Sequence, residues 1–182
     1  MTSIYCSNKL EKLIGTALFE SNDESYESDF GDWFAHYKSF RRKKCLFLIH
    51  VPTYYTIVFA DFKKKDIVNL QNDFYQLLES RLINDLIIKS NHNLDLGKLI
   101  GGINFHKSNN DKKTIATLNQ RIYDFEIHLD WHNLSFEEKD MLYMNALLNK
   151  SLSKSRYGKR NDYINPVTEM KEKIKNYTQQ NK

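Results

Sequence analysis

The chain has 182 residues, of which 41% are hydrophobic and 27% are charged, and its formal net charge is +4. This composition excludes a chain that is disordered throughout, and the length suits one domain that buries roughly 70% of its unfolded surface. Two cysteines without a Cys-x-x-Cys pair exclude a disulfide framework, and no apolar run approaches the ~20 residues of a membrane span. We therefore expect one cytoplasmic domain over residues 1–182.

The N-terminal quarter predicts a strand, a helix and a loop. Residues 3–6 are typical of a short strand, and Asn8 with Glu11 predicts the start of a helix that runs to about Phe19. The stretch 21–31 is rich in Ser, Asp and Glu and has no apolar period. It is therefore expected to be an acidic mobile loop.

Two apolar runs, at residues 45–51 and 54–60, are separated by a segment that contains Pro52. Their β-branched and aromatic residues predict an antiparallel hairpin. Because both runs are apolar almost throughout, at least one strand is expected to lie inside the sheet, with helices on both faces.

The rest of the chain has mainly helical periodicity. Asp66 is expected to cap a helix that runs towards Leu86, and residues 103–106 predict a further strand. Apolar residues from Ile115 to Leu129 recur three and four apart, which predicts another helix.

Two further helix starts are marked by capping residues. Ser135 and Glu138 form the pattern of a capping box, and Pro166 stands at the first position of the last helix. Residues 177–182 are expected to be a disordered tail. These elements together predict an α+β domain with a small, mainly antiparallel sheet around the hairpin at about 45–60, covered by four or five helices.

One dense motif and several thin ones carry a resemblance that spans most of the chain. The matching pieces are Asp32-Trp33, Ala35, Arg41-Arg42-Lys43, Cys45-Leu46-Phe47 and the Lys-rich segment 61–66. The chain resembles an uncharacterised bacterial domain family with an Asp-Trp-His-Ala motif followed by Arg-Arg-Lys-Cys-Leu-Leu-Phe. The resemblance implies a whole-chain α+β domain without an established activity.

The chain departs from that motif at one position. Phe34 stands where the family has His, and the nearest imidazole belongs to His36. In an extended segment these two residues point to the same face, about 6–7 Å apart. We interpret Trp33 and Phe34 as core or lid aromatics, although the same residues also suit a substrate-stacking platform.

Four residues within a short segment offer a coherent catalytic chemistry. Asp32 supplies a carboxylate, His36 an imidazole, and Arg41 and Arg42 supply guanidinium groups that stabilise negative charge. They predict a small hydrolase or phosphate-directed enzyme. The alternative is structural, because either arginine can also pair with Asp32 or Asp61.

Two basic segments are candidates for binding nucleic acid or another anion. Lys63, Lys64 and Lys65 follow the hairpin, and Arg156, Lys159 and Arg160 surround Tyr157. Lysine and arginine release counterions from a phosphate backbone, and an interleaved aromatic residue suits base stacking. Both segments are equally typical of solvated loops.

Asp124, His128 and His132 recur every four residues, so that they lie on one side of a helix. Two histidines with this spacing can hold a transition metal, but no third ligand of recognised spacing follows. The alternative is an Asp124–His128 pair at the helix surface. We expect no metal and no cofactor.

No complete catalytic constellation is present, and the basic excess lies in the C-terminal third. We therefore expect a non-enzymatic binding or regulatory module with a protein or nucleic-acid partner and no membrane association. The alternative is the enzyme described above.

Overall fold

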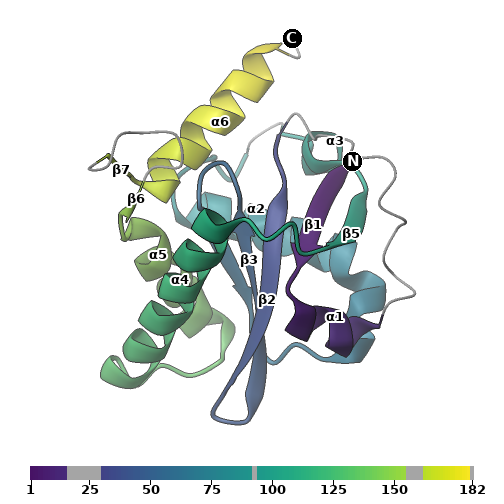
Figure 1. Cartoon of the computed structure of the whole chain (residues 1–182). Coiled ribbons are helices and arrows are strands. Elements are labelled where there is room, and N and C mark those ends of the chain that lie inside the picture. Colours follow the sequence, from purple (N-terminus) through teal and green to yellow (C-terminus); the bar gives the residue numbers. More distant parts are fainter. Residues whose placement is uncertain (16–29, 92–93, 155–161, 181–182) are drawn as a thin grey trace.

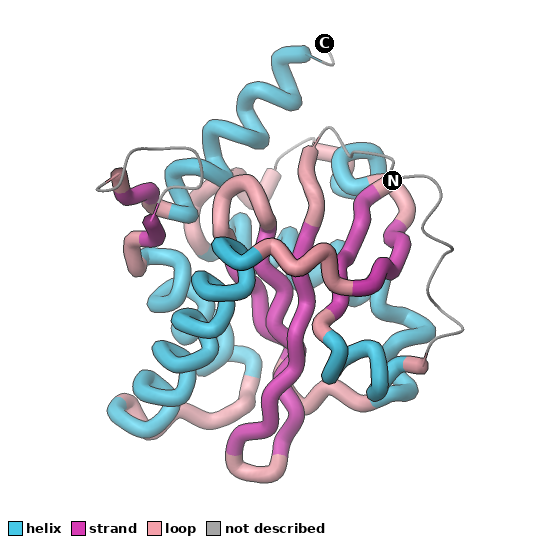
Figure 2. The backbone as a smooth tube through the Cα atoms, viewed as in Figure 1, coloured by secondary structure: helices cyan, strands magenta, loops and turns pink. Residues whose placement is uncertain are grey.

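The computed structural model describes residues 1–15, 30–91, 94–154 and 162–180. Within them a five-stranded sheet stands between two layers of helices (Figures 1 and 2). Its strand order is β4-β3-β2-β1-β5, and a second sheet pairs β6 with β7. The strands are β1 (Thr2–Cys6), β2 (Trp33–Phe40), β3 (Lys43–His50), β4 (Thr56–Phe59), β5 (Ile103–Lys107), β6 (Ser153–Lys154) and β7 (Tyr163–Ile164).

The main sheet is mixed. Strands β2, β3 and β4 are antiparallel neighbours, whereas β1 runs parallel to both β2 and β5. The predicted α+β class is confirmed, and the predicted hairpin supplies β3 and β4 of the mixed sheet. The parallel half arises because β1 and β5 reach the sheet through helical and loop connections rather than through tight turns.

The described residues form six α-helices and a 3-10 helix, η2. They are α1 (Asn8–Ile14), η2 (Lys64–Asn69), α2 (Leu70–Asn84), α3 (Leu96–Ile100), α4 (Lys112–Trp131), α5 (Glu138–Lys150) and α6 (Pro166–Gln180). Residues of α1, α2, α3 and α6 join one hydrophobic cluster, and residues of α4 and α5 join another. Each cluster fills one face of the main sheet.

The alternation of side chains along β3 explains the two clusters. Leu46 and Leu48 belong to the cluster with α1 and α2, while Cys45, Phe47 and Ile49 belong to the cluster with α4 and α5. Successive residues of a strand point to opposite faces, so both sides of β3 are buried. The prediction of a hairpin strand inside the sheet with helices on both faces is confirmed.

The starts of two helices differ from the predictions. Ser7, not Asn8, caps α1, because its Oγ accepts the Leu10 N–H. The helix expected from Asp66 begins two residues earlier as η2, and the Asp66 carboxylate accepts the Lys63 N–H at 2.7 Å.

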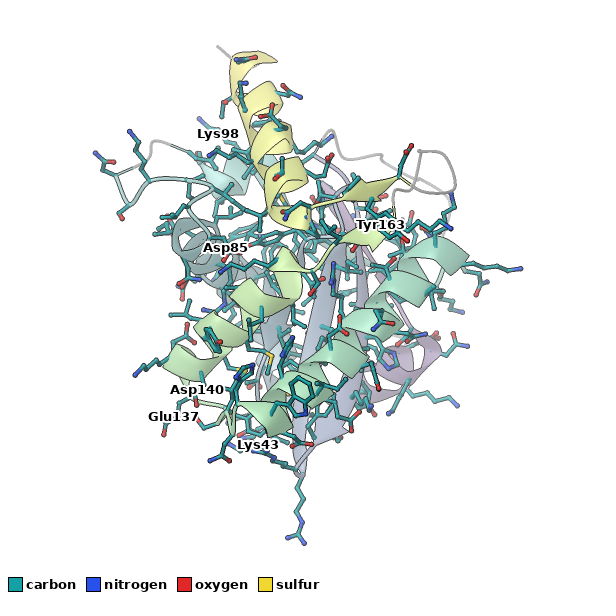
Figure 3. The ribbon with its side chains drawn as sticks, turned by 90° about the vertical axis from the view of Figure 1, so that its left-hand side faces the viewer. Lys43, Asp85, Lys98, Glu137, Asp140 and Tyr163 are labelled. Atoms are coloured by element: carbon teal, nitrogen blue, oxygen red, sulfur yellow. The ribbon has the colours of Figure 1, made fainter. Side chains whose placement is uncertain are left out.

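The capping box expected at Ser135 and Glu138 is wrong. Glu137 is the N-cap of α5, and the Ser135 N–H is held instead by the Asp140 carboxylate at 2.6 Å. Hydrogen bonds from Ser135 lower the pKa of Asp140. Glu137 and Asp140 lie at the same end of the molecule as Lys43, which begins β3 (Figure 3).

The predicted mobile loop and the predicted disordered tail both include residues that the structure describes. In the predicted acidic loop, residues 21–29 lie outside the described part, but the Phe30 side chain is fully buried. In the predicted tail, α6 continues to Gln180, and the Tyr177 hydroxyl donates to the Lys98 carbonyl. Residues 181–182 lie outside the description.

Among the described helices, none has both the length and the apolar character needed to cross a membrane.

Candidate functional site

A cavity of about 370 Å³ lies beside the parallel half of the sheet. It is lined by residues 7–9 directly after β1, Phe34 and His36 in β2, Ser108 and Asn110 after β5, and Ile115, Leu118 and Asn119 in α4. The segment between β5 and α4 crosses in front of β2 (Figure 1). Ligands of open sheets commonly bind outside the carboxyl ends of parallel strands, which is the position of this cavity.

The strand register brings Ser7 and His36 together. Cys6 pairs with Ala35 across the parallel strands β1 and β2, so the next residues along the two strands are also neighbours. Ser7 Oγ lies 2.8 Å from His36 Nδ1. This oxygen also accepts the Leu10 N–H at 3.3 Å, and the hydroxyl keeps both its proton and a second lone pair for the contact with Nδ1, so the direction of that hydrogen bond follows the tautomer of the ring.

The electrostatic setting keeps His36 neutral. Burial lowers the pKa of His36 below its ordinary value, and the positive charges of Lys9 and Lys38 lower it further. In the tautomer that carries its proton on Nε2, Nδ1 accepts from the Ser7 hydroxyl. At neutral pH His36 is therefore a neutral imidazole with one ring nitrogen, Nδ1, beside a hydroxyl group.

The cavity combines an apolar wall with polar groups. Phe34 and Leu118 are buried, and the side chains of Asn8 and Asn119 belong to the polar part of the lining. Lys9 is the one charged residue among the described residues of the lining, which includes no Asp or Glu. This distribution favours a ligand that is polar or anionic at one end.

The motif position occupied by Phe34 contributes to this cavity. Phe34 and His36 line the same space, as expected for residues two apart in a strand. Phe34 is only 3% exposed and packs in the cluster with α4 and α5, while Trp33 is fully buried in the opposite cluster. Both residues are core aromatics as predicted, and Phe34 in addition forms part of the cavity wall.

The other three members of the predicted catalytic set do not line the cavity. Arg41 and Arg42 form the turn between β2 and β3, with φ values of 45° and 69°. At the rise of a strand, Arg41 is roughly 16 Å from His36 and Asp32 is roughly 13 Å away in the other direction. The structure therefore separates the four residues.

Arg41 instead has a structural role. Its guanidinium donates to the carbonyl groups of Leu134 and Leu129 and to the carboxylate of Asp130 at 2.8 Å. The expected pairing of an arginine with Asp32 or Asp61 is thus replaced at Arg41 by a contact with the end of α4. The Asp61 carboxylate instead lies near the ammonium groups of Lys43 and Lys63.

A basic surface adjoins the cavity through α1. It consists of the exposed residues Lys9, Lys12, Lys44, Lys63, Lys64 and Lys65. The ammonium groups of Lys9 and Lys44 lie 5.0 and 5.9 Å from the centre of the Tyr37 ring. The Phe62 N–H donates to the Lys44 carbonyl, which places Lys44 beside the start of η2. Arg156, Lys159 and Arg160 lie outside the described residues.

The predicted metal candidates are engaged in other contacts. Asp124 accepts a hydrogen bond from Gln120 at 2.8 Å and lies 3.8 Å from Arg121, so the expected Asp124–His128 pair is wrong. His128 stacks on His132 with ring centres 5.5 Å apart. Among the described residues, no group of three His, Cys, Asp or Glu side chains is arranged to hold a metal ion.

These observations define a three-layer α+β domain with a cavity at the carboxyl ends of its parallel strands. The chain belongs to a family described as a domain of unknown function, DUF6933, whose model matches residues 3–169. The match includes every described strand except the first residue of β1, and every residue that lines the cavity. No curated protein matches the chain.

Proposed function

We propose that the chain is a binding module for an anionic partner, and that this partner is a single-stranded nucleic acid. The observation that carries the proposal is the basic surface, in which Lys9 of α1 and Lys44 of β3 lie over the Tyr37 ring and the Lys44 carbonyl accepts the N–H of Phe62, just before η2. Lys9 belongs both to this surface and to the cavity lining. A strand that follows the lysines can therefore place one nucleotide or its phosphate at the cavity.

Two carboxylates of the same region, those of Asp61 and Asp66, contact neighbouring residues of that region. Asp61 lies 3.7 Å from the Lys43 ammonium and 3.5 Å from that of Lys63, and Asp66 accepts the Lys63 N–H. Lys64 and Lys65 project from the first turn of η2 and are exposed. They are the lysines best placed to release counterions from a phosphate backbone.

The proposal is tested with a fluorescein-labelled oligonucleotide of about ten nucleotides, near the size of one single-strand binding site. Fluorescence polarisation is measured over a range of salt concentrations. The log of the association constant should fall linearly with log salt. The double variant Lys64→Ala with Lys65→Ala should make this fall less steep, by about 1.4 in the slope, since each single-strand contact contributes about 0.7.

The matched control is Lys171→Ala with Lys175→Ala on α6, which removes the same charge from exposed positions outside the basic surface. It should leave the slope unchanged. If both double variants reduce the steepness of the salt dependence equally, binding responds to net charge and not to the basic surface. No binding even at about 50 mM salt overturns the nucleic-acid partner and leaves a protein as the partner of the module.

The proposal includes a cytoplasmic location, which is supported by the state of the two thiols. Cys6 and Cys45 are both free and buried. Burial raises the pKa of the Cys45 thiol to about 12 and raises that of Cys6 further, so that neither is a thiolate at neutral pH. Such thiols are compatible with a reducing compartment.

The hydrolase alternative keeps one of its four residues at the cavity. His36 lines it, while Asp32, Arg41 and Arg42 do not. The observation that favours a hydrolytic reaction is the contact between Ser7 and His36, and not the predicted combination of His36 with Asp32 and the two arginines.

A further inference from the structure

We propose that Ser7 is a nucleophile that His36 activates, and that the pair cleaves small carboxylic esters in the cavity. The argument rests on the contact between Ser7 Oγ and His36 Nδ1 at 2.8 Å and on the cavity into which both residues open. It does not depend on the nucleic-acid partner proposed above. A nucleophile and a base within hydrogen-bond reach are the minimum requirement for covalent catalysis by serine.

The backbone presents Ser7 to the cavity. Ser7 joins β1 to α1, with φ −62° and ψ 152°, so the chain passes from strand to helix at this residue. Serine nucleophiles of other hydrolases also stand between a strand and a helix. Here the backbone conformation is ordinary, and the position of the hydroxyl is fixed by its two hydrogen bonds, to the Leu10 N–H and to His36.

The reaction balances with water as the second reactant. Ser7 Oγ attacks the ester carbonyl carbon while its proton moves to His36 Nδ1. The carbon–oxygen bond to the alcohol then breaks, and the alcohol leaves with that proton. Water attacks the acyl group on Ser7 through the same base, which releases the carboxylic acid and restores the serine hydroxyl.

The lining supplies the other groups that this chemistry needs. Side-chain amides of Asn8, Asn110 and Asn119 border the cavity, and amide N–H groups are suitable donors to an oxyanion. Lys9 favours an acyl or alcohol part that carries a negative charge. The volume of about 370 Å³ admits a small ester and excludes a folded chain.

The helix-capping role of Ser7 must be separated from a catalytic one. Capping requires only an oxygen that accepts the Leu10 N–H, and aspartate serves this purpose as well as serine does. Ser7→Asp therefore keeps the cap and removes the hydroxyl nucleophile. His36→Gln removes the base and leaves Ser7 in place.

The experiment treats the full chain with a fluorophosphonate probe, whose phosphorus–fluorine bond breaks as the phosphorus binds a serine oxygen. Intact mass and peptide mapping should show one adduct, on Ser7. Ser7→Asp should give no adduct at an unchanged melting temperature, and His36→Gln should slow labelling by about 100-fold or more. Ser39→Ala, at an exposed serine of β2, is the control and should label like the wild type.

A second reagent tests the ester chemistry itself. p-Nitrophenyl acetate should give a burst of one p-nitrophenolate per chain, with the acetyl group found on Ser7. The labelling rate of the wild type should fall at low pH as His36 becomes protonated. A folded wild type that takes no adduct, an adduct on another residue, or equal labelling of Ser7→Asp overturns the proposal.

Discussion

Acidification should destabilise this protein through one buried histidine, His50. Its ring is fully buried between Phe30 and Trp33, whose ring centres lie 4.9 and 5.0 Å from that of His50. His50 Nε2 donates to the Phe30 carbonyl at 3.1 Å, and the Thr53 hydroxyl lies 2.8 Å from Nδ1. Both nitrogens are therefore used by the neutral ring.

Burial is the main cause that lowers the pKa of His50 from 6.5 to about 3. The unfolded chain binds a proton below pH 6.5, whereas the folded chain does so only near pH 3. The contribution of the neutral His50 to the free energy of unfolding is therefore complete above pH 6.5 and is lost as the pH falls from 6.5 towards 3. At 1.36 kcal/mol for each pKa unit, the loss at pH 5 is about 2 kcal/mol.

The assay is urea unfolding of the wild type and of His50→Gln, each at pH 7.5 and at pH 5. Gln keeps a donor for the Phe30 carbonyl but does not titrate. The variant should be less stable at pH 7.5 and should lose about 2 kcal/mol less than the wild type on acidification. The same pH dependence in both proteins refutes the reasoning.

Three further predictions concern the packing. Asn149→Ala should cost about 2 kcal/mol in urea unfolding, because the Asn149 amide holds both the N–H and the carbonyl of Thr56 in the edge strand β4; a cost near zero contradicts this. Gly31→Ala should lower the melting temperature, because φ is +116° and the added Cβ lies 2.6 Å from a proline carbon; an unchanged temperature refutes it. Cys6 and Cys45 should react with a disulfide reagent only after denaturation, and rapid reaction of the native protein contradicts their burial.

The hairpin and the helices were predictable because their signals are local. The apolar runs of β3 and β4 are only a few residues apart, and the periodicity of α4 and the Asn165–Pro166 start of α6 are contained in short windows. The Asn165 carboxamide does accept the N–H groups of the first turn of α6. Tertiary contacts are not needed to recognise such elements.

The site was harder to predict because it depends on long-range register. The sequence indicates His36 as a candidate, but its partner Ser7 has no local signal and meets it only because β1 pairs in parallel with β2. The predicted catalytic set includes Arg41 and Arg42 because nothing in the sequence marks the turn that they form. Hairpin turns with positive φ usually contain Gly or Asn, and these two arginines adopt that backbone without them.

The account is tested most directly by comparing oligonucleotide binding of the two lysine double variants over the same range of salt. We predict that Lys64→Ala with Lys65→Ala weakens binding and makes the fall of log affinity with log salt less steep by about 1.4, while Lys171→Ala with Lys175→Ala behaves like the wild type. Equal binding and equal slopes for both double variants would contradict the assignment of the basic surface as the nucleic-acid contact.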